Sequence, residues 1–244
     1  MWFRIATDRP AAIVILAALI VSACASSGGG GSASAAPSAS NPTGGGSSGS
    51  RPSSSTTTGA GDCSAAGSDP AEAIRSAERA YLAAPSFHAE MTTDDGNGTA
   101  TAMTLEYVSP DRYRVVFGEG SSATETVQIG SSYWIKANGQ WTKGAGVDMT
   151  QVIGAARQMV DAAKIDDASF IGTETVDGEP ANVYHYVFDM SAGSSVAKAD
   201  GRMWVRLADC WPARLEGDST TTFGVTHYVQ KIGHYGAVTI DEPV

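Results

Sequence analysis

The chain has little of several features that mark common protein classes. It has three cysteines and no apolar run of the ~20 residues that a membrane-spanning helix needs. Sixteen bases stand against 26 acids, for a net charge of −10, and so acidic a chain is a poor partner for nucleic acid or an anionic membrane surface. No glycine-rich loop lies between an expected strand and an expected helix, as phosphate binding requires. We therefore expect no nucleic-acid binding and no phosphate-loop chemistry.

Residues typical of metal sites and acid–base catalysis are also sparse. None of the four histidines shows a ligand-pair spacing such as H-x-x-x-H; they are His88, His185, His227 and His234. The pairs Asp94-Asp95 and Asp166-Asp167 are adjacent, and neighbouring residues of a strand point to opposite faces, so neither pair predicts an acid–base couple. We expect the protein to bind no metal and no cofactor and to have no enzymatic activity.

What the chain does have begins at its N-terminal end. The apolar run 11–21 follows Arg4 and Arg9 and is long enough for a secretory signal but too short for a bilayer span. The run closes on Val21-Ser22-Ala23-Cys24, which resembles a bacterial lipobox. In such precursors the cysteine takes a diacylglyceryl group and acyl chains such as palmitate, and the residues before it are removed. The alternative is a plain secretion signal with a chance cysteine.

Composition divides the chain into three parts. Residues 1–23 are the expected signal peptide, and residues 24–60 are the expected lipidated Cys24 and a Gly/Ser/Ala linker with too little apolar surface to fold. Residues 61–244 have the aromatic and β-branched content of one domain. This domain holds all but four of the charged residues and has a net charge of −12. Membrane attachment is therefore expected from the acyl anchor, on the extracytoplasmic face of the cell membrane.

Two cysteines remain if Cys24 carries lipid. In an oxidising compartment Cys63 and Cys210 are expected to form a disulfide. The alternative is two buried free thiols.

Two segments have the pattern of amphipathic helices. Asp69 is an N-cap signal followed by Pro70, and the helix is expected to end before Pro85. Its apolar face is expected to hold Ile74, Ala77, Tyr81 and Leu82, with Arg75, Glu78 and Arg79 pointing away. A second helix is expected after Asp148, with an apolar stripe wide enough to cover a sheet face.

The remaining segments alternate in the period of two that strands show, with turn signals between them. About ten strands are expected between Ser86 and the C-terminal end, the last a short one at 238–240. The turns between them are expected to include 94–98, Asn138-Gly139 and Asp177-Gly178. This series predicts an α+β domain, or an open barrel, with a curved antiparallel sheet and helices on one face.

Residues 107–114, YVSPDRYR, resemble the Y-x-x-P-D-R-Y-R hairpin of LolA-like lipoprotein carriers and their actinobacterial glycolipid-carrier relatives. Shorter segments at 129–133, 176–184, 204–205 and 212–216 are similar to the same family in the same order. The resemblance implies a half-open antiparallel β-barrel of about ten strands, with two or more helices across the concave face and an apolar cavity for acyl chains. The family's soluble periplasmic carrier has no lipid anchor, so the expected anchor favours the membrane-tethered relatives.

Apolar positions on the expected strands and helices are the candidates for lining that cavity. They are Met103, Leu105, Tyr107, Tyr113, Val115, Phe117, Val127, Ile129, Ile153, Val160, Tyr186, Phe188, Met203, Val205, Phe223 and Val225, with Tyr81 from the first helix. The alternative is that they fill an ordinary core.

The expected function is therefore an envelope lipoprotein that binds a lipid, glycolipid or acylated protein and hands it on, with an envelope transport protein as a partner. A second hypothesis is an interaction or sensor module of the same fold that binds an exported protein domain without lipid. A distant third is a secreted hydrolase that uses one of the histidines.

Overall fold

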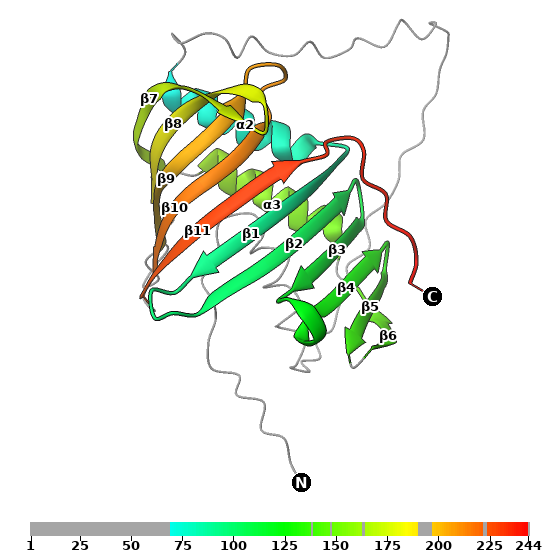
Figure 1. Ribbon diagram of the computed structural model, residues 1–244. Coiled ribbons are helices and arrows are strands. Elements are labelled where there is room, and N and C mark those ends of the chain that lie inside the picture. Colours follow the sequence, from blue (N-terminus) through cyan, green and yellow to red (C-terminus); the bar gives the residue numbers. More distant parts are fainter. Residues whose placement is uncertain are drawn as a thin grey trace, which may run out of the picture.

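A computed structural model describes residues 69–137, 139–146, 148–162, 164–189, 197–221 and 224–243. Within these residues one antiparallel sheet of eleven strands curves beside two helices (Figure 1). The order across the sheet is β6-β5-β4-β3-β2-β1-β11-β10-β9-β8-β7. The expected large antiparallel sheet with two helices is confirmed, with eleven strands instead of about ten.

The elements have the following bounds. The helices are α2 (Pro70–Ala83) and α3 (Met149–Ala162). The strands are β1 (Ser86–Asp94), β2 (Ala100–Val108), β3 (Arg112–Phe117), β4 (Thr124–Ile129), β5 (Ser132–Ala137), β6 (Gln140–Ala145), β7 (Lys164–Val176), β8 (Glu179–Asp189), β9 (Ala197–Arg206), β10 (Pro212–Thr221) and β11 (Gly224–Gly233), with a 3-10 turn at Gly120–Ser122.

Both helices begin at the caps that the sequence predicts. The Asp69 carboxylate accepts a hydrogen bond of 3.0 Å from the backbone N–H of Ala71, and Pro70 takes the first helical position. The Asp148 carboxylate accepts one of 3.3 Å from the N–H of Gln151. In each case a short polar side chain satisfies a backbone donor that the helix itself leaves unpaired.

The sheet consists of two meanders that meet in its centre. Strands β1 to β6 form one and β7 to β11 the other, and they are joined by the antiparallel pairing of β1 with β11. That pairing runs from His88 opposite Gly233 to Asp94 opposite His227. The first and last strands thus lie side by side, and their pairing joins the two meanders into one continuous sheet.

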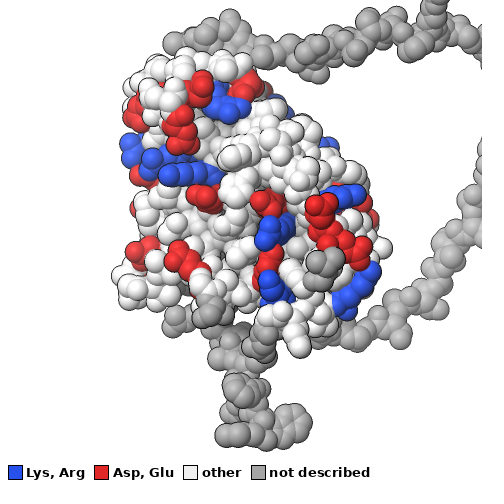
Figure 2. All heavy atoms as spheres, turned by 45° about the vertical axis from the view of Figure 1, so that its right-hand side comes forward, with Lys and Arg blue, Asp and Glu red and all other residues white. Residues whose placement is uncertain are grey.

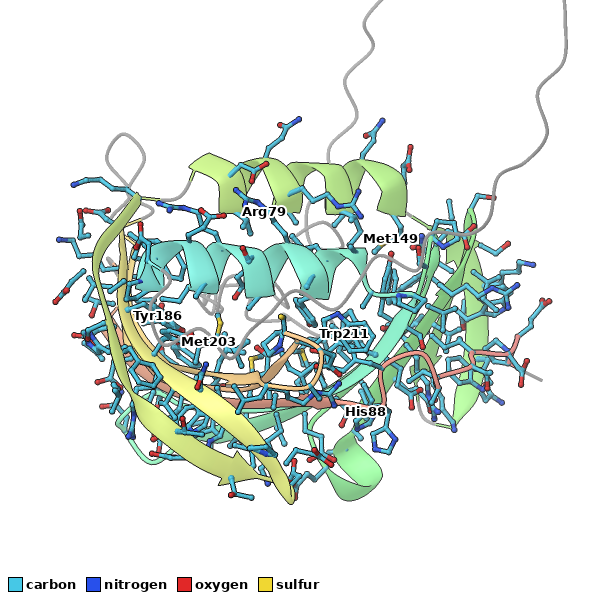
Figure 3. The ribbon with its side chains drawn as sticks, turned by 90° about the horizontal axis from the view of Figure 1, so that it is seen from above. Arg79, His88, Met149, Tyr186, Met203 and Trp211 are labelled. Atoms are coloured by element: carbon cyan, nitrogen blue, oxygen red, sulfur yellow. The ribbon has the colours of Figure 1, made fainter. Side chains whose placement is uncertain are left out.

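The helices lie on one face of the sheet, which we call the concave face. α2 packs against β7, β8, β9 and β10, whereas α3 packs mainly on α2. Seen from above, α2 lies between α3 and the strands (Figure 3). The concave face is therefore covered by two layers of helix, with α2 on the sheet and α3 on α2.

The opposite, convex face carries charged residues in cross-strand groups. Arg114 of β3 contacts Glu106 of β2 at 3.6 Å and Glu125 of β4 at 2.6 Å, while Arg202 of β9 contacts Glu216 of β10 at 3.2 Å. In the view of Figure 2, most basic side chains lie next to acidic ones, and a few basic side chains adjoin one another at the upper left. Positive charge on this face is therefore largely accompanied by negative charge.

Four strands of the second meander share one row across the concave face. Tyr186 of β8 lies opposite Gly201 of β9, which lies opposite Gly217 of β10, which lies opposite Tyr228 of β11. The two glycines leave the space over β9 and β10 open, and the tyrosine hydroxyls meet across it at 2.7 Å. The row therefore joins four strands through one buried hydrogen bond.

β7 begins at Lys164, so Asp166 and Asp167 belong to a strand. One expectation about strands was wrong. Residues 238–240 form no strand; they lie against the convex face, where Val238 N–H donates to Ser86 Oγ at 3.2 Å and Ile240 C=O accepts from Arg112 at 3.1 Å.

Replacing Gly201 with alanine tests the tyrosine–glycine row. A Cβ at Gly201 would lie 2.6 Å from the backbone oxygen of Glu216 and 3.0 Å from Tyr228 Oη. We expect Gly201→Ala to lower the free energy of unfolding by roughly 1–3 kcal/mol, the usual result of overpacking. Urea denaturation measures it. The matched control is Gly233→Ala, where a Cβ meets nothing within 4 Å; equal losses in the two variants would contradict this account of the row.

Candidate functional site

Most of the predicted lining residues come together in one main buried cluster between α2 and the concave face. The cluster spans both meanders and includes the start of α3 through Met149. Predicted residues within it or packed against it are Met103, Leu105, Tyr107, Tyr113, Val115, Phe117, Ile153, Tyr186, Phe188, Met203 and Val205. In Figure 3 the labelled Tyr186 and Met203 lie on the helix side of the sheet, and His88 lies on the other. The concave face thus holds the largest cluster of buried apolar residues in the described chain.

Three predicted lining residues lie on the convex face instead. Val127 and Ile129 of β4 stand opposite Trp134 and Arg112, and they pack in a separate cluster under Ile240. Val225 of β11 is 53% exposed. Inward positions of β4 are taken by its other parity, including Gln128 opposite Tyr113. These three assignments are corrected; Phe223 lies outside the described residues.

The predicted residue Val160 of α3 has a different neighbourhood from the strand residues. It forms a small buried cluster with Leu82 of α2 and Ala156, and Ile153 packs against both this cluster and the main one. On the outer side Arg79 contacts Asp161 at 2.9 Å, and Arg157 donates to the Leu82 carbonyl at 3.0 Å. Val160 therefore holds the two helices together.

Aromatic rings cover the concave face near the C-terminal end of α2. Tyr81 lies 4.4 Å from Phe87 of β1, and Phe87 lies 5.3 Å from Tyr107 of β2, measured between ring centroids. On the far side Tyr235 lies 4.2 Å from Trp211, and its hydroxyl donates to the Pro212 carbonyl at 2.7 Å. This end of the interior is closed by large rigid side chains.

Glu78 is buried, contrary to the expectation that it points away from the core. It is only 8% exposed and shares the inward side of α2 with Ile74 and Tyr81. Burial raises the pKa of its carboxyl to about 7, because the charged form loses its hydration. The signal was present in the sequence: Ile74, Glu78 and Tyr81 have the spacing of one helix face, whatever their polarity.

Further inward polar residues on β11 were also missed. Tyr228 and Gln230 alternate with Val229 and Lys231, and they face α2 together with Ile232. Burial raises the pKa of Tyr228 to about 12. Both parities of this strand carry apolar residues, so the alternation alone could not show which parity faces inward.

Three of the histidines lie beside carboxylates on the convex face. His185 pairs with Asp200 and His227 with Asp218, each at 2.9 Å, and both pairs are exposed on the convex face. His88 lies 3.5 Å from Glu90 and Glu106. Among the described residues there is no cluster of three or more His, Cys, Asp or Glu side chains that could hold a metal.

The expected lipidation and disulfide lie at the edge of what the structure describes. Cys24 and Cys63 are outside the described residues, so the anchor and the Cys63–Cys210 pairing stay predictions. Cys210 is half-buried and packs against the main buried cluster. In the described part of the chain, neither helix is long and apolar enough to cross a membrane.

Comparison with known proteins gives similarities of fold. By sequence, the chain matches no family model and no curated protein. By structure, it is similar to LprF from Mycobacterium bovis, with a TM-score of 0.50, 12% identity, and coverage of 71% of this chain and 96% of that one. It is similar to lipoprotein LppX of Mycobacterium tuberculosis, with a TM-score of 0.50, 16% identity, and coverage of 71% and 100%. A LolA superfamily protein from Nitrosomonas europaea aligns with a TM-score of 0.34, 11% identity, and coverage of 71% and 96%.

The likeness to LprF and LppX extends over nearly the whole of each of those chains. It shows that the chain has the fold of these two proteins. At these identities the likeness concerns the fold alone.

The raised pKa of Glu78 predicts a pH dependence of stability. Between the ordinary value of 4.5 and the folded value of about 7, the folded chain binds more protons here than the unfolded one, so stability falls as pH rises through this window. The tyrosines that face the carboxyl, Tyr81, Tyr186 and Tyr228, remain neutral there. We expect wild type to lose about 2–3 kcal/mol between pH 5 and pH 8 through this group.

Urea denaturation at the two pH values measures this loss. Glu78→Gln should remove most of it, whereas Glu90→Gln, on the convex face, should keep it. A Glu78→Gln variant with the full wild-type loss would contradict the assignment.

Proposed function

We propose that this chain is a lipoprotein, anchored through Cys24 on the extracytoplasmic face of the cell membrane, that binds a lipid or lipidated molecule on its concave face and hands it on within the envelope. The observation that carries the proposal is the main buried cluster, which forms one apolar surface across both meanders. Each buried methylene of a ligand contributes ~0.8 kcal/mol, so an acyl chain needs no charged contact to be held there.

The arrangement of the helices supports an interior that can admit a chain. α2 packs on the strands of the second meander, and α3 packs mainly on α2. The inward side chains of β2 and β3 in the first meander, Leu105 and Val115 among them, are covered through residues such as Met149 at the start of α3. A displacement of the helix pair would expose this apolar surface without breaking the sheet.

The lipobox and the fold point to the same class of protein. Residues 21–24 resemble the acylation signal of bacterial lipoproteins, and one of the similar structures is named a lipoprotein. Membrane attachment through the expected acyl chains would leave the acidic domain in the aqueous envelope, where its concave face could meet lipid.

Lipid binding predicts a bound mass in native mass spectrometry of the full chain, lost on organic extraction. We expect Val115→Thr to weaken acyl-chain binding about threefold to tenfold, since it places a hydroxyl of equal size on the concave face. The matched control is Val116→Thr, on the same strand but in register with Thr104 and Glu125 of the convex face; it should bind as wild type does.

Two results would contradict lipid binding. One is a folded wild type that carries no lipid and takes up none when lipid is supplied. The other is an equal effect of the two threonine variants. A lipid-free chain that instead purifies with an exported protein domain in fixed ratio would support the interaction-module hypothesis.

Anchoring makes a separate prediction. Cys24→Ala should abolish incorporation of labelled palmitate and move the chain from the membrane fraction to the soluble fraction. Fractionation of cells grown with the label measures both. Label retained in the variant would show that Cys24 is not the acylation site.

A further inference from the structure

Three polar side chains lie buried beneath α2, in surroundings that are otherwise apolar. Glu78 and Tyr81 are one turn apart on the inward side of α2, and Gln230 faces them from β11; they are 8%, 2% and 3% exposed. We call these three residues the polar recess. The neighbouring hydroxyls of Tyr186 and Tyr228 bond to each other. The recess has no such pairing.

The polar groups of the recess are not fully satisfied. Tyr81 Oη and Gln230 Nε2 are shielded from solvent and have no partner at full hydrogen-bond geometry. The Gln230 amide interacts with the Tyr81 hydroxyl, which lowers the pKa of the tyrosine, but their approach falls short of the geometry of a full hydrogen bond. In the described part of the chain no hydrogen bond or ion pair reaches the Glu78 carboxyl. Each buried group left unpaired costs about 1–3 kcal/mol, so folded proteins rarely retain such groups.

The donors and acceptors of the recess fit one kind of ligand group. Gln230 Nε2 donates, Tyr81 Oη both donates and accepts, and the Glu78 carboxyl accepts when ionised and donates when protonated. A ligand hydroxyl, which also donates and accepts, can satisfy all three. A phosphate or carboxylate cannot do so as well, because the recess adds an acidic group and Glu78 has no Lys or Arg partner.

We propose that Glu78, Tyr81 and Gln230 bind a hydroxyl group of the lipid ligand, so that the protein selects hydroxyl-bearing lipids over lipids of the same acyl length that lack the hydroxyl. The inference rests on the proposed lipid binding and specifies its ligand class.

The register of the sheet supplies a path for the rest of the ligand. Gln230 stands opposite Met91 of β1, Met91 opposite Met103 of β2, and Met103 opposite Phe117 of β3. A hydroxyl held in the recess therefore places the acyl chain along an apolar row into the first meander. Methionine side chains adapt to irregular shapes more easily than branched ones do, which suits a flexible chain.

Entry to the recess requires movement of α2, since Tyr81 Oη and Gln230 Nε2 are shielded. α2 is held from outside by the contacts of Arg79 with Asp161 and of Arg157 with Leu82. These outer contacts must be released, and α2 must move away from β11, before a ligand can reach the recess.

Competition between two lipids of equal acyl length tests the proposal. The full chain, purified in detergent, is incubated with equimolar 1-monopalmitoylglycerol, which has two free hydroxyls, and methyl palmitate, which has none. Native mass spectrometry gives the ratio of the two bound species for wild type, Tyr81→Phe, Gln230→Leu and the control Gln151→Leu, whose side chain is exposed on α3. Partition into detergent is common to all four proteins, so a change in the ratio reports the protein's own selectivity.

We expect wild type and Gln151→Leu to favour monopalmitoylglycerol about tenfold or more, as several new hydrogen bonds would give. Tyr81→Phe and Gln230→Leu should each reduce the preference threefold or more, with methyl palmitate binding retained. Both should be at least as stable as wild type when empty, because the removed groups made no full hydrogen bond. Loss of folding in either variant would contradict the expected stability. The other variant would still measure the contribution of the recess to selectivity.

The outcomes separate this inference from the proposed function. If methyl palmitate binds and wild type shows no preference, or the variants keep it, the recess holds water at most and the inference fails while lipid binding stands. If neither lipid binds, the proposed function fails as well.

Discussion

The pairing of β1 with β11 is the contact on which the rest of the structure depends. It joins the first strand of the domain to the last, and without it the two meanders would be separate sheets with separate apolar faces. A single small sheet buries little on one face, whereas eleven strands in register give one concave surface large enough to face two helices. The long separation in sequence between these strands also makes this the contact that local patterns reveal least.

The features of the candidate site gather at this junction. Gln230 and Tyr228 lie on β11, Phe87 and Met91 on β1, and Tyr81 reaches them from α2. On one side of the junction the tyrosine–glycine row braces the second meander. On the other side the inward residues of β1 to β3 are apolar. The polar recess therefore lies at the boundary between a braced half and an apolar half, where a ligand could be held at one end by hydrogen bonds and along its length by burial.

Local signals predicted much of the fold and part of the site. Asp69, Pro70 and Asp148 begin the helices where expected, and the Asp177-Gly178 turn joins β7 to β8 with both residues at positive φ. Such signals act within a few residues. The face on which Val127 and Ile129 lie depends instead on Ile240, more than a hundred residues away, which covers the convex side of β4. Strand alternation alone cannot reveal a distant segment of that kind.

Glu78 shows that the polarity of a residue can wrongly predict its exposure. Its helical spacing places it on the buried face, but its charge suggests solvent, and the spacing decides.

A crystal structure with a brominated fatty acid would show whether lipid lies against the concave face. We expect anomalous bromine peaks between α2 and the inward side chains of β1 to β3, close to Met103 and Val115. Bromine peaks confined to the convex face would contradict lipid binding on the concave face. So would a concave face packed only with the protein's own side chains, without bromine, at saturating ligand.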